Sequence, residues 1–219
     1  PDLSEHMDDP MCDLQMLRNT YAQFGYVNGA FAGWRRIYKR WIRPLLSGAP
    51  SRLLDIGCGG GDLVERIATW TSRDGLKVDI TAADPDSRAV DYLNGRSLPR
   101  NITVLQTTSA DLVAEGRTYD VVISNHVIHH LSSQELQRFL SDSRKLATNL
   151  ALHNDIRRDD LAYLGFIPTQ LLFRRSFITV DGLTSIRRSY LPGELRRVIP
   201  DSWRVQSMPL FRNLLYWNP

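Results

Sequence analysis

A glycine-rich stretch at residues 57–61 is the part of the sequence whose residue types point most directly to chemistry. It follows an apolar run and precedes a helical pattern, so it predicts a tight turn between a buried strand and a helix. A dinucleotide-binding turn would need a small residue where Asp62 stands, and carboxylates at Asp55 and Asp62 would repel a pyrophosphate. A ligand with a cationic amine and a sulfonium tolerates both acids. We therefore expect the backbone of this turn to approach a small cationic molecule closely.

Histidines form a second group of residues suited to chemistry. His126, His129 and His130 follow the predicted strand 119–124, and His153 ends the predicted strand 149–153. The carboxyl ends of parallel strands border the ligand crevice, and an imidazole can remove a proton from a hydroxyl or enol near neutral pH. We expect His126, His130 and His153 to be catalytic, with the alternative that a histidine here only begins a helix.

Polar residues also end the other predicted strands. The strand 77–83 is followed by Asp84 and Pro85, and an acid there can accept hydrogen bonds from two ribose hydroxyls. The strand 102–106 leads to a segment that contains Ala110, Asp111 and Leu112. Asn125 follows the strand 119–124. All of these positions fall on the same edge of a parallel sheet, where they predict one ligand site.

These segments, in this order and spacing, resemble the class I S-adenosylmethionine-dependent methyltransferases over about residues 50–155. Residues 53–63 look like their first motif, Asp84 like the ribose-binding acid, and Asp111 like the acid that accepts from the adenine amine. The resemblance implies S-adenosylmethionine as cofactor, S-adenosylhomocysteine as product, and a methyltransferase as the activity. The residues that it implies for cofactor binding are Asp55, Gly57, Cys58, Gly59, Asp84, Pro85, Ala110, Asp111, Leu112 and Asn125.

The residues after the fourth predicted strand narrow the class of acceptor. No proline follows Asn125, as it would in enzymes that methylate amines of DNA bases, and no pair of glutamates is present to bind a guanidinium. The segment is similar to the small-molecule branch of ubiquinone, menaquinone and polyketide-tailoring enzymes, which implies O- or C-methylation of an aromatic, phenolic or lipid-tailed acceptor in secondary metabolism. A non-catalytic S-adenosylmethionine-binding protein, and a nucleic-acid or protein methyltransferase, remain alternatives.

A metal ion is an alternative to the catalytic base. The ubiquinone enzymes have Glu-x-x-Glu-His where this chain has His126, His129 and His130, and three imidazoles on one helical face suit zinc better than magnesium. We predict no metal, with these three histidines as the ligands if one binds.

The alternation of strand and helix patterns predicts a Rossmann-like, doubly wound sheet of seven strands, mostly parallel, with a C-terminal antiparallel hairpin. We expect residues 1–10 to be disordered and residues 11–219 to form one domain. Within it, residues 11–48 would form cap helices, and residues 155–191 a lid after the fifth strand, with an extended segment 177–180 and a turn at 181–182.

Composition fits a single cytoplasmic domain. The chain has 219 residues, 42% hydrophobic content and two cysteines, and it lacks an apolar run long enough to span a membrane. The net charge is only +3, but arginine pairs at 157/158, 174/175, 187/188 and 196/197 make the C-terminal third basic. These pairs predict either solvated helix faces or peripheral contact with an anionic membrane. A monomer or a homodimer is expected, with a small-molecule acceptor as partner.

Overall fold

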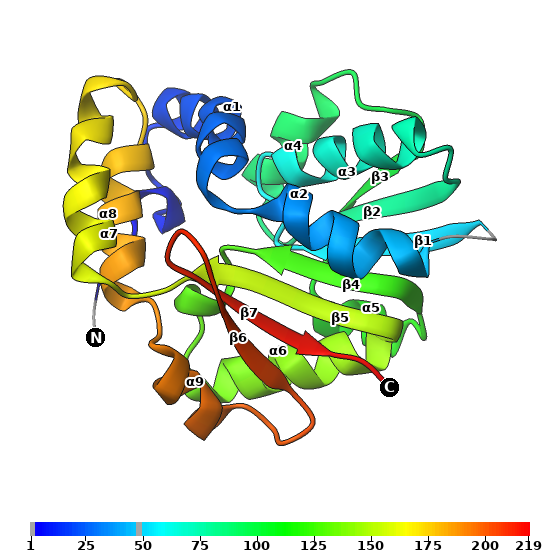
Figure 1. Ribbon diagram of the computed structural model, residues 1–219. Helices are drawn as coiled ribbons and strands as arrows, with labels where there is room; N and C mark the ends of the chain where they lie inside the picture. The colour runs from blue at the N-terminus through cyan, green and yellow to red at the C-terminus, as the bar shows by residue number, and fades with distance from the viewer. Residues whose placement is uncertain (1–2, 47–49) are drawn as a thin grey trace.

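The computed structural model describes residues 3–46 and 50–219. Its centre is a seven-stranded sheet in the order β3-β2-β1-β4-β5-β7-β6 (Figure 1). Strands β1 to β5 run parallel, and β7 lies antiparallel to both β5 and β6. The predicted doubly wound sheet with a C-terminal antiparallel hairpin is therefore confirmed. The strands are β1 Ser51–Ile56, β2 Val78–Asp84, β3 Ile102–Gln106, β4 Tyr119–Asn125, β5 Ala147–Ile156, β6 Arg204–Met208 and β7 Arg212–Trp217.

Helices cover both faces of the sheet, because alternate residues of each strand point to opposite sides. Leu53 of β1 packs with residues of α2 Trp34–Ile37, α3 Asp62–Arg73 and α4 Ser87–Asn94. Its neighbour Leu54 packs on the other face with α5 Ser109–Ala114, α6 Ser133–Leu146 and α9 Pro192–Val198. Helix α2 continues into a π-helical turn, Tyr38–Ile42, and a 3-10 turn, Arg43–Leu45.

A third group of helices lies beyond the carboxyl ends of β1, β4 and β5. It comprises α1 Leu14–Phe31, α7 Asp160–Phe166, the 3-10 helix Ile167–Leu171 and α8 Ile178–Arg188. Figure 1 shows α7 and α8, in yellow and orange, beside the blue N-terminal segment and α1. A small cluster that includes Leu17 and Tyr21 of α1 and Phe177 joins these elements. They lie where the ligand crevice of a doubly wound sheet is expected.

The sequence prediction of an extended segment at 177–180 and a turn at 181–182 is wrong, because α8 runs through both. Gly182 lies inside this helix, and a β-carbon there would come within 2.3 Å of the ring of Phe166. The glycine therefore allows α7 and α8 to approach each other closely, instead of forming a turn.

The N-terminal segment also differs from the prediction. Residues 1–10 were expected to be disordered, yet His6–Asp8 form a 3-10 helix and Glu5 is only 4% exposed. Backbone nitrogens of His6 and Met7 donate to the carboxylate of Asp181 on α8 at 2.8 and 2.9 Å. These long-range contacts fix a segment whose polar composition gives no sign of order.

Candidate active site

A cavity of about 730 Å³ lies between the carboxyl ends of the strands and the layer formed by α1, α7 and α8. The glycine turn and Asp84 line one part of it. His126, His129 and His130 line another part, together with Glu5. The cavity therefore joins the two groups of residues that the sequence singled out.

The glycine turn at 57–61 leaves the backbone open to the cavity. Gly57 has φ +72°, and a β-carbon there would lie 2.6 Å from a methyl carbon of Val127. At Gly60 a β-carbon would meet the backbone oxygen of Tyr21 at 3.0 Å. Neither position accepts a side chain without movement of its neighbours. The turn thus packs tightly on α1 while its backbone forms part of the cavity wall.

Asp84 links the end of β2 to this turn. Its Oδ2 accepts a hydrogen bond from the backbone nitrogen of Gly59 at 2.8 Å, and its Oδ1 accepts one from the nitrogen of Asp86 at 2.9 Å. Burial raises the pKa of Asp84, and the two backbone hydrogen bonds oppose that rise. Each oxygen keeps a further lone pair that can accept from a ligand hydroxyl in the cavity.

Two more carboxylates lie near the turn. Asp55 is fully buried, its Oδ1 has no hydrogen-bond partner among the described residues, and burial together with the charges of Asp62 and Asp84 raises its pKa well above the usual value. Asp62 accepts hydrogen bonds from Asn28 Nδ2 at 3.1 and 3.2 Å. Three acids around one turn favour a cationic ligand over a phosphate.

The segment after β3 differs from its prediction. Pro85, Thr108 and Ser109 line the cavity, whereas Ala110, Asp111 and Leu112 do not. Asp111 accepts from the hydroxyl of Thr108 at 2.6 Å and caps α5, and Leu112 is fully buried in the core. Helix-capping chemistry therefore accounts for Asp111, and the structure brings Thr108 and Ser109 to the cavity instead.

Asn125 and His126 end β4 at the cavity. Asn125 Oδ1 accepts from Trp34 Nε1 and from Arg212 Nη2, both at 3.0 Å. His126 has φ +62°, and its Nε2 lies 3.1 Å from Asn28 Oδ1 and 3.3 Å from Arg212 Nη1. Burial and the charge of Arg212 lower the pKa of His126 well below its usual value, so this imidazole is neutral.

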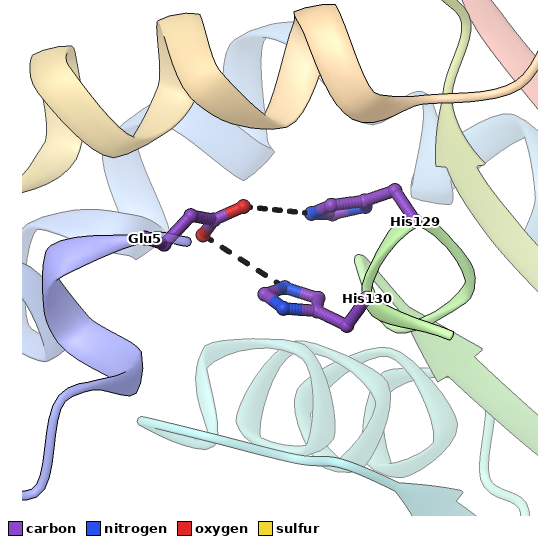
Figure 2. Close-up of side chains that lie close together, drawn as sticks. All are labelled: Glu5, His129 and His130. Carbon is purple, nitrogen blue, oxygen red and sulfur yellow. Dashed lines mark ion pairs between the residues drawn. The ribbon is translucent and has the colours of Figure 1, made fainter. Parts of the chain in front are cut away.

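His129 and His130 follow in a 3-10 helix, Ile128–His130, and the carboxylate of Glu5 faces both imidazoles (Figure 2). His129 Nδ1 lies 2.7 Å from Asp155 Oδ1, and its Nε2 lies 3.3 Å from Glu5 Oε1. Burial lowers the pKa of His129, but the charges of Asp155 and Glu5 and the hydrogen bond with Asp155 outweigh it and raise the pKa to about 9. His129 is therefore an imidazolium at neutral pH.

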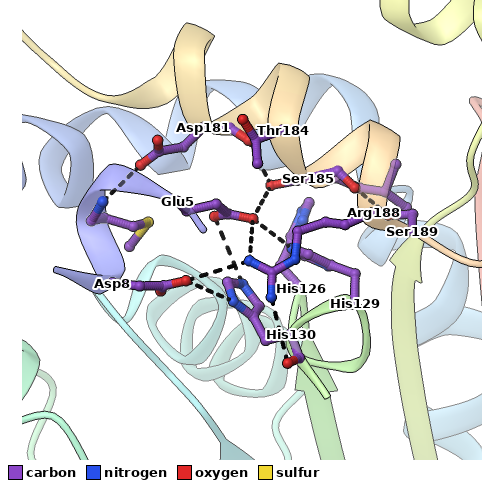
Figure 3. A network of polar contacts seen from close by, with 12 residues as sticks. Glu5, Asp8, His126, His129, His130, Asp181, Thr184, Ser185, Arg188 and Ser189 are labelled. Atoms are coloured by element: carbon purple, nitrogen blue, oxygen red, sulfur yellow. Dashed lines mark hydrogen bonds and ion pairs between the residues drawn. The ribbon is translucent and has the colours of Figure 1, made fainter. Parts of the chain in front are cut away.

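His130 is the more accessible of the two. Its side chain is 28% exposed, its Nδ1 lies 3.2 Å from Asp8 Oδ2, and its Nε2 lies 3.8 Å from Glu5 Oε2. Figure 3 shows these groups as one network with Asp181, Ser185 and Arg188 of α8.

The structure does not bring His153 to the cavity. Strand β5 continues to Ile156, three residues beyond the predicted end, so His153 lies within the sheet and pairs with Leu215 of β7. Its ring packs against Phe139 and Trp203, and its Nδ1 bonds Ser124 Oγ at 2.8 Å. Burial lowers its pKa to about 3. The prediction that His153 lies at the ligand crevice is wrong.

Comparisons with known proteins agree with this geometry. Residues 53–149 match the family described as "Methyltransferase domain". This match covers less than half of the 219 residues. Among curated proteins, the ubiquinone biosynthesis O-methyltransferases of Roseobacter denitrificans and Cereibacter sphaeroides are 36% and 39% identical over 84 and 83 residues. These matches span 37% of this chain and only 32% and 31% of those proteins.

Solved structures show that the fold extends over almost the whole chain. A plantazolicin methyltransferase bound to S-adenosylhomocysteine has a TM-score of 0.60 and 12% identity, covering 93% of this chain and 95% of that one. Human N-acetylserotonin methyltransferase in complex with S-adenosylmethionine has a TM-score of 0.64 and 11% identity, covering 94% of this chain and 56% of that one.

The residues of the cavity fit S-adenosylmethionine, the cofactor that the sequence resemblance implies. The backbone of Gly57, Gly59 and Gly60 lines the cavity without side chains, and the orphaned oxygen of Asp55 suits a cationic amine. Asp84 presents an acceptor for ribose hydroxyls, and Cys58, Pro85 and Asn125 also line the cavity.

The three histidines that were the alternative metal ligands are not arranged as a single site. Described residues that could hold an ion form two groups: Glu5 with His129 and His130, and His126 with His129 and Asp155. His126, His129 and His130 do not form one group, because His126 turns toward Asn28 and Arg212.

Sequence reasoning missed several polar side chains at this site. Acids at the ends of the other predicted strands were assigned to the site. A prediction that continued the fifth strand to Ile156 would have included Asp155 among them. Glu5, Asp8, Ser185 and Arg212 carry no motif, and only their long-range contacts reveal them.

Proposed function

We propose that this protein transfers a methyl group from S-adenosylmethionine to an oxygen, or to a carbon, of a small aromatic, phenolic or lipid-tailed acceptor. The observation that carries the proposal is the single cavity, which joins the glycine turn and Asp84 to a wall containing His126, His129 and His130. A cofactor held at the first part would present its reactive end toward the second.

The cavity wall supports an apolar acceptor. Phe24 and Phe31 of α1 face it from one side, and Ala162 and Phe166 of α7 from another. Such a wall excludes water, and a desolvated nucleophile attacks a methyl group more readily than a hydrated one. The similarity of part of this chain to ubiquinone biosynthesis O-methyltransferases supports an aromatic acceptor that carries an apolar tail.

Among the histidines, His130 is best placed to act as the base. S-adenosylmethionine supplies a methyl group on a sulfonium, whose sulfur keeps the bonding electron pair as the methyl leaves. The acceptor hydroxyl gives its proton to Nε2 of His130, while Nδ1–H of this imidazole donates to Asp8. His129 is already protonated, so it stabilises a developing oxyanion instead of accepting a proton.

The outer face of the lid supports an acceptor taken from a lipid phase. Leu161, Leu164, Leu171, Leu172 and Val180 are all more than half exposed on α7, α8 and the turns between them. The sequence adds Arg174 and Arg175 to the same lid. Basic and apolar groups together suit peripheral contact with an anionic membrane. None of the described helices is long and apolar enough to cross a membrane.

The function is tested with S-adenosylmethionine labelled in its methyl group and a panel of phenols, hydroxyquinols and enolic diketones. We expect the wild-type protein to transfer the label to an extractable product. We expect Asp84→Ala to lose this transfer. DNA, RNA and protein acceptors serve as comparison substrates, and label transferred only to one of these would overturn the acceptor class. Tight binding of S-adenosylhomocysteine without transfer to any acceptor would indicate an accessory protein instead.

A further inference from the structure

The carboxylate of Glu5 lies in a pocket of donors that all belong to other parts of the chain (Figures 2 and 3). Its Oε1 accepts a hydrogen bond from Ser185 Oγ at 2.7 Å. The same oxygen lies 3.3 Å from His129 Nε2 and 3.7 Å from Arg188 Nη1. Its Oε2 lies 3.8 Å from His130 Nε2. A single carboxylate is thus surrounded by two imidazoles, a guanidinium and a hydroxyl.

Glu5 fills this pocket imperfectly. His129 Nε2 and Arg188 Nη1 are buried, yet neither makes a hydrogen bond with any described residue. Their distances to Glu5 are those of ion pairs and not of well-formed charge-assisted hydrogen bonds, which are about 2.7–2.9 Å long. Buried cationic donors that lack a hydrogen bond carry a desolvation cost, which a better-placed acceptor would remove.

The charges of the pocket favour an anion over a metal ion. Burial raises the pKa of Glu5, but the charge of His129 and the hydrogen bond from Ser185 outweigh it and lower the pKa below its usual value, so Glu5 is ionised. Glu5, His129 and His130 have ligand spacing for a cation. However, the guanidinium of Arg188 lies beside the same Glu5 oxygen and would repel one, and His129 would first have to lose its proton.

We propose that His129, Arg188 and Ser185 form a carboxylate-binding subsite for the acceptor, which Glu5 fills in the acceptor-free protein. The proposal rests on the proposed function and narrows it: the acceptor carries an acidic group, such as the carboxylate of an aromatic acid, close to the atom that is methylated. Glu5, His129 and Ser185 all line the same cavity as the cofactor residues. A bound acid would therefore lie within reach of the methyl donor and beside His130.

Release of Glu5 requires little rearrangement. The neighbouring residues are anchored independently of its side chain, because His6 and Met7 donate to Asp181 and Arg88 donates to the carbonyl oxygens of Met7 and Asp9. Rotation of the Glu5 side chain is enough to vacate the subsite. Glu5 then acts as an internal competitor that keeps the buried cations paired until an acid arrives.

The experiment uses the full chain saturated with S-adenosylhomocysteine and two probes of equal size, 2-naphthoate and 2-naphthamide, in titration calorimetry. Glu5→Ala removes the competitor, so its affinity for naphthoate should rise about tenfold over wild type while naphthamide changes less than about twofold. Adding Arg188→Met to Glu5→Ala should abolish the gain. Glu5→Gln keeps the shape of the side chain without its charge, so its affinity for naphthoate should rise less than that of Glu5→Ala. This variant still tests the subsite if Glu5→Ala does not fold.

Several outcomes would overturn the subsite. Equal binding of the acid and the amide by Glu5→Ala and by Glu5→Gln would remove the case for an anion. Stoichiometric binding of Zn²⁺ or Mn²⁺ to wild type that Glu5→Ala abolishes would show that the cluster is a metal site. Binding of S-adenosylhomocysteine is measured first in each variant, and its absence in wild type would contradict the proposed function itself, independently of the subsite.

Discussion

Asp84 accepts a hydrogen bond at 2.8 Å from the backbone nitrogen of Gly59, so the acid at the end of β2 fixes the glycine turn at the end of β1. The two strands are parallel neighbours, which brings their carboxyl ends together. A cofactor would bind to both at once, and each stabilises the position of the other. This relationship makes Asp84 the first residue to test.

Replacing Asp84 with alanine should weaken binding of S-adenosylhomocysteine by roughly 1.5–3 kcal/mol, because a charge-assisted acceptor for two hydroxyls is lost. Asp79→Ala is the matched control, since Asp79 lies exposed on the same strand. Calorimetry measures both. Equal affinity in the two variants would contradict the assignment of Asp84 to the ribose.

Gly57→Ala should abolish cofactor binding, and Gly75→Ala should leave it unchanged. Both glycines have a positive φ, +72° and +70°, so both substitutions carry a similar backbone strain of about 1 kcal/mol. Only at Gly57 would the new β-carbon meet another residue, Val127. If both variants bind S-adenosylhomocysteine like wild type, the turn does not form the cofactor site.

His130→Gln should lower turnover by about 10²–10⁴-fold and leave the affinity for S-adenosylhomocysteine intact, because a base acts on the acceptor and not on the cofactor. Asp8→Asn should lower turnover less, since it only weakens the orientation of the imidazole. Steady-state kinetics with the acceptor found by labelling gives both values. Turnover within a few-fold of wild type in His130→Gln would assign the base elsewhere.

The ion pair of His129 with Asp155 and Glu5 should make stability depend on pH. The folded-state pKa of His129, about 9, lies above the ordinary value of 6.5, so its stabilisation is complete below pH 6.5 and is lost as the pH rises through 9. The melting temperature of wild type should therefore fall between pH 7 and 9.5 more than that of His129→Gln. Parallel curves for the two proteins over this range would show that His129 is not protonated in the folded state.

Phe166→Glu should weaken acceptor binding, whereas Phe173→Glu should have a smaller effect, because Phe166 lines the cavity and Phe173 does not. Both lie in the predicted lid at residues 155–191. Acceptor KM and melting temperature are measured for each variant. A loss of several degrees with an unchanged KM would indicate that Phe166 is a core residue instead of part of the acceptor wall.

Local patterns were sufficient for the sheet and for the part of the cavity around the glycine turn. Apolar runs that end in acids, separated by helical spacing, predict strands β1 to β5, and the glycine turn follows from the need for backbone without side chains. These signals lie close together in the sequence. For that reason Asp55, Gly57, Gly59 and Asp84 could be assigned to one site from the sequence alone.

The acceptor end was decided by tertiary structure. The alternation of apolar and polar residues does not define where β5 ends. In the structure β5 continues to Ile156, so His153 lies in the core and Asp155 lies beside His129. The helix α8 depends on the packing of Gly182 against Phe166. Neither the end of β5 nor the helix α8 could be predicted from the residues of that segment alone.

The sequence by itself determined the doubly wound sheet and the glycine turn between β1 and α3, because both follow from hydrophobic periodicity and from turn chemistry within short segments. Only the tertiary structure decided which charges meet in the acceptor pocket. Glu5 is polar and lies in a polar segment, and its burial depends on a hydroxyl, an imidazole and a guanidinium contributed by distant residues. Coulombic pairing of that kind depends on distance in space, which the order of residues along the chain does not give.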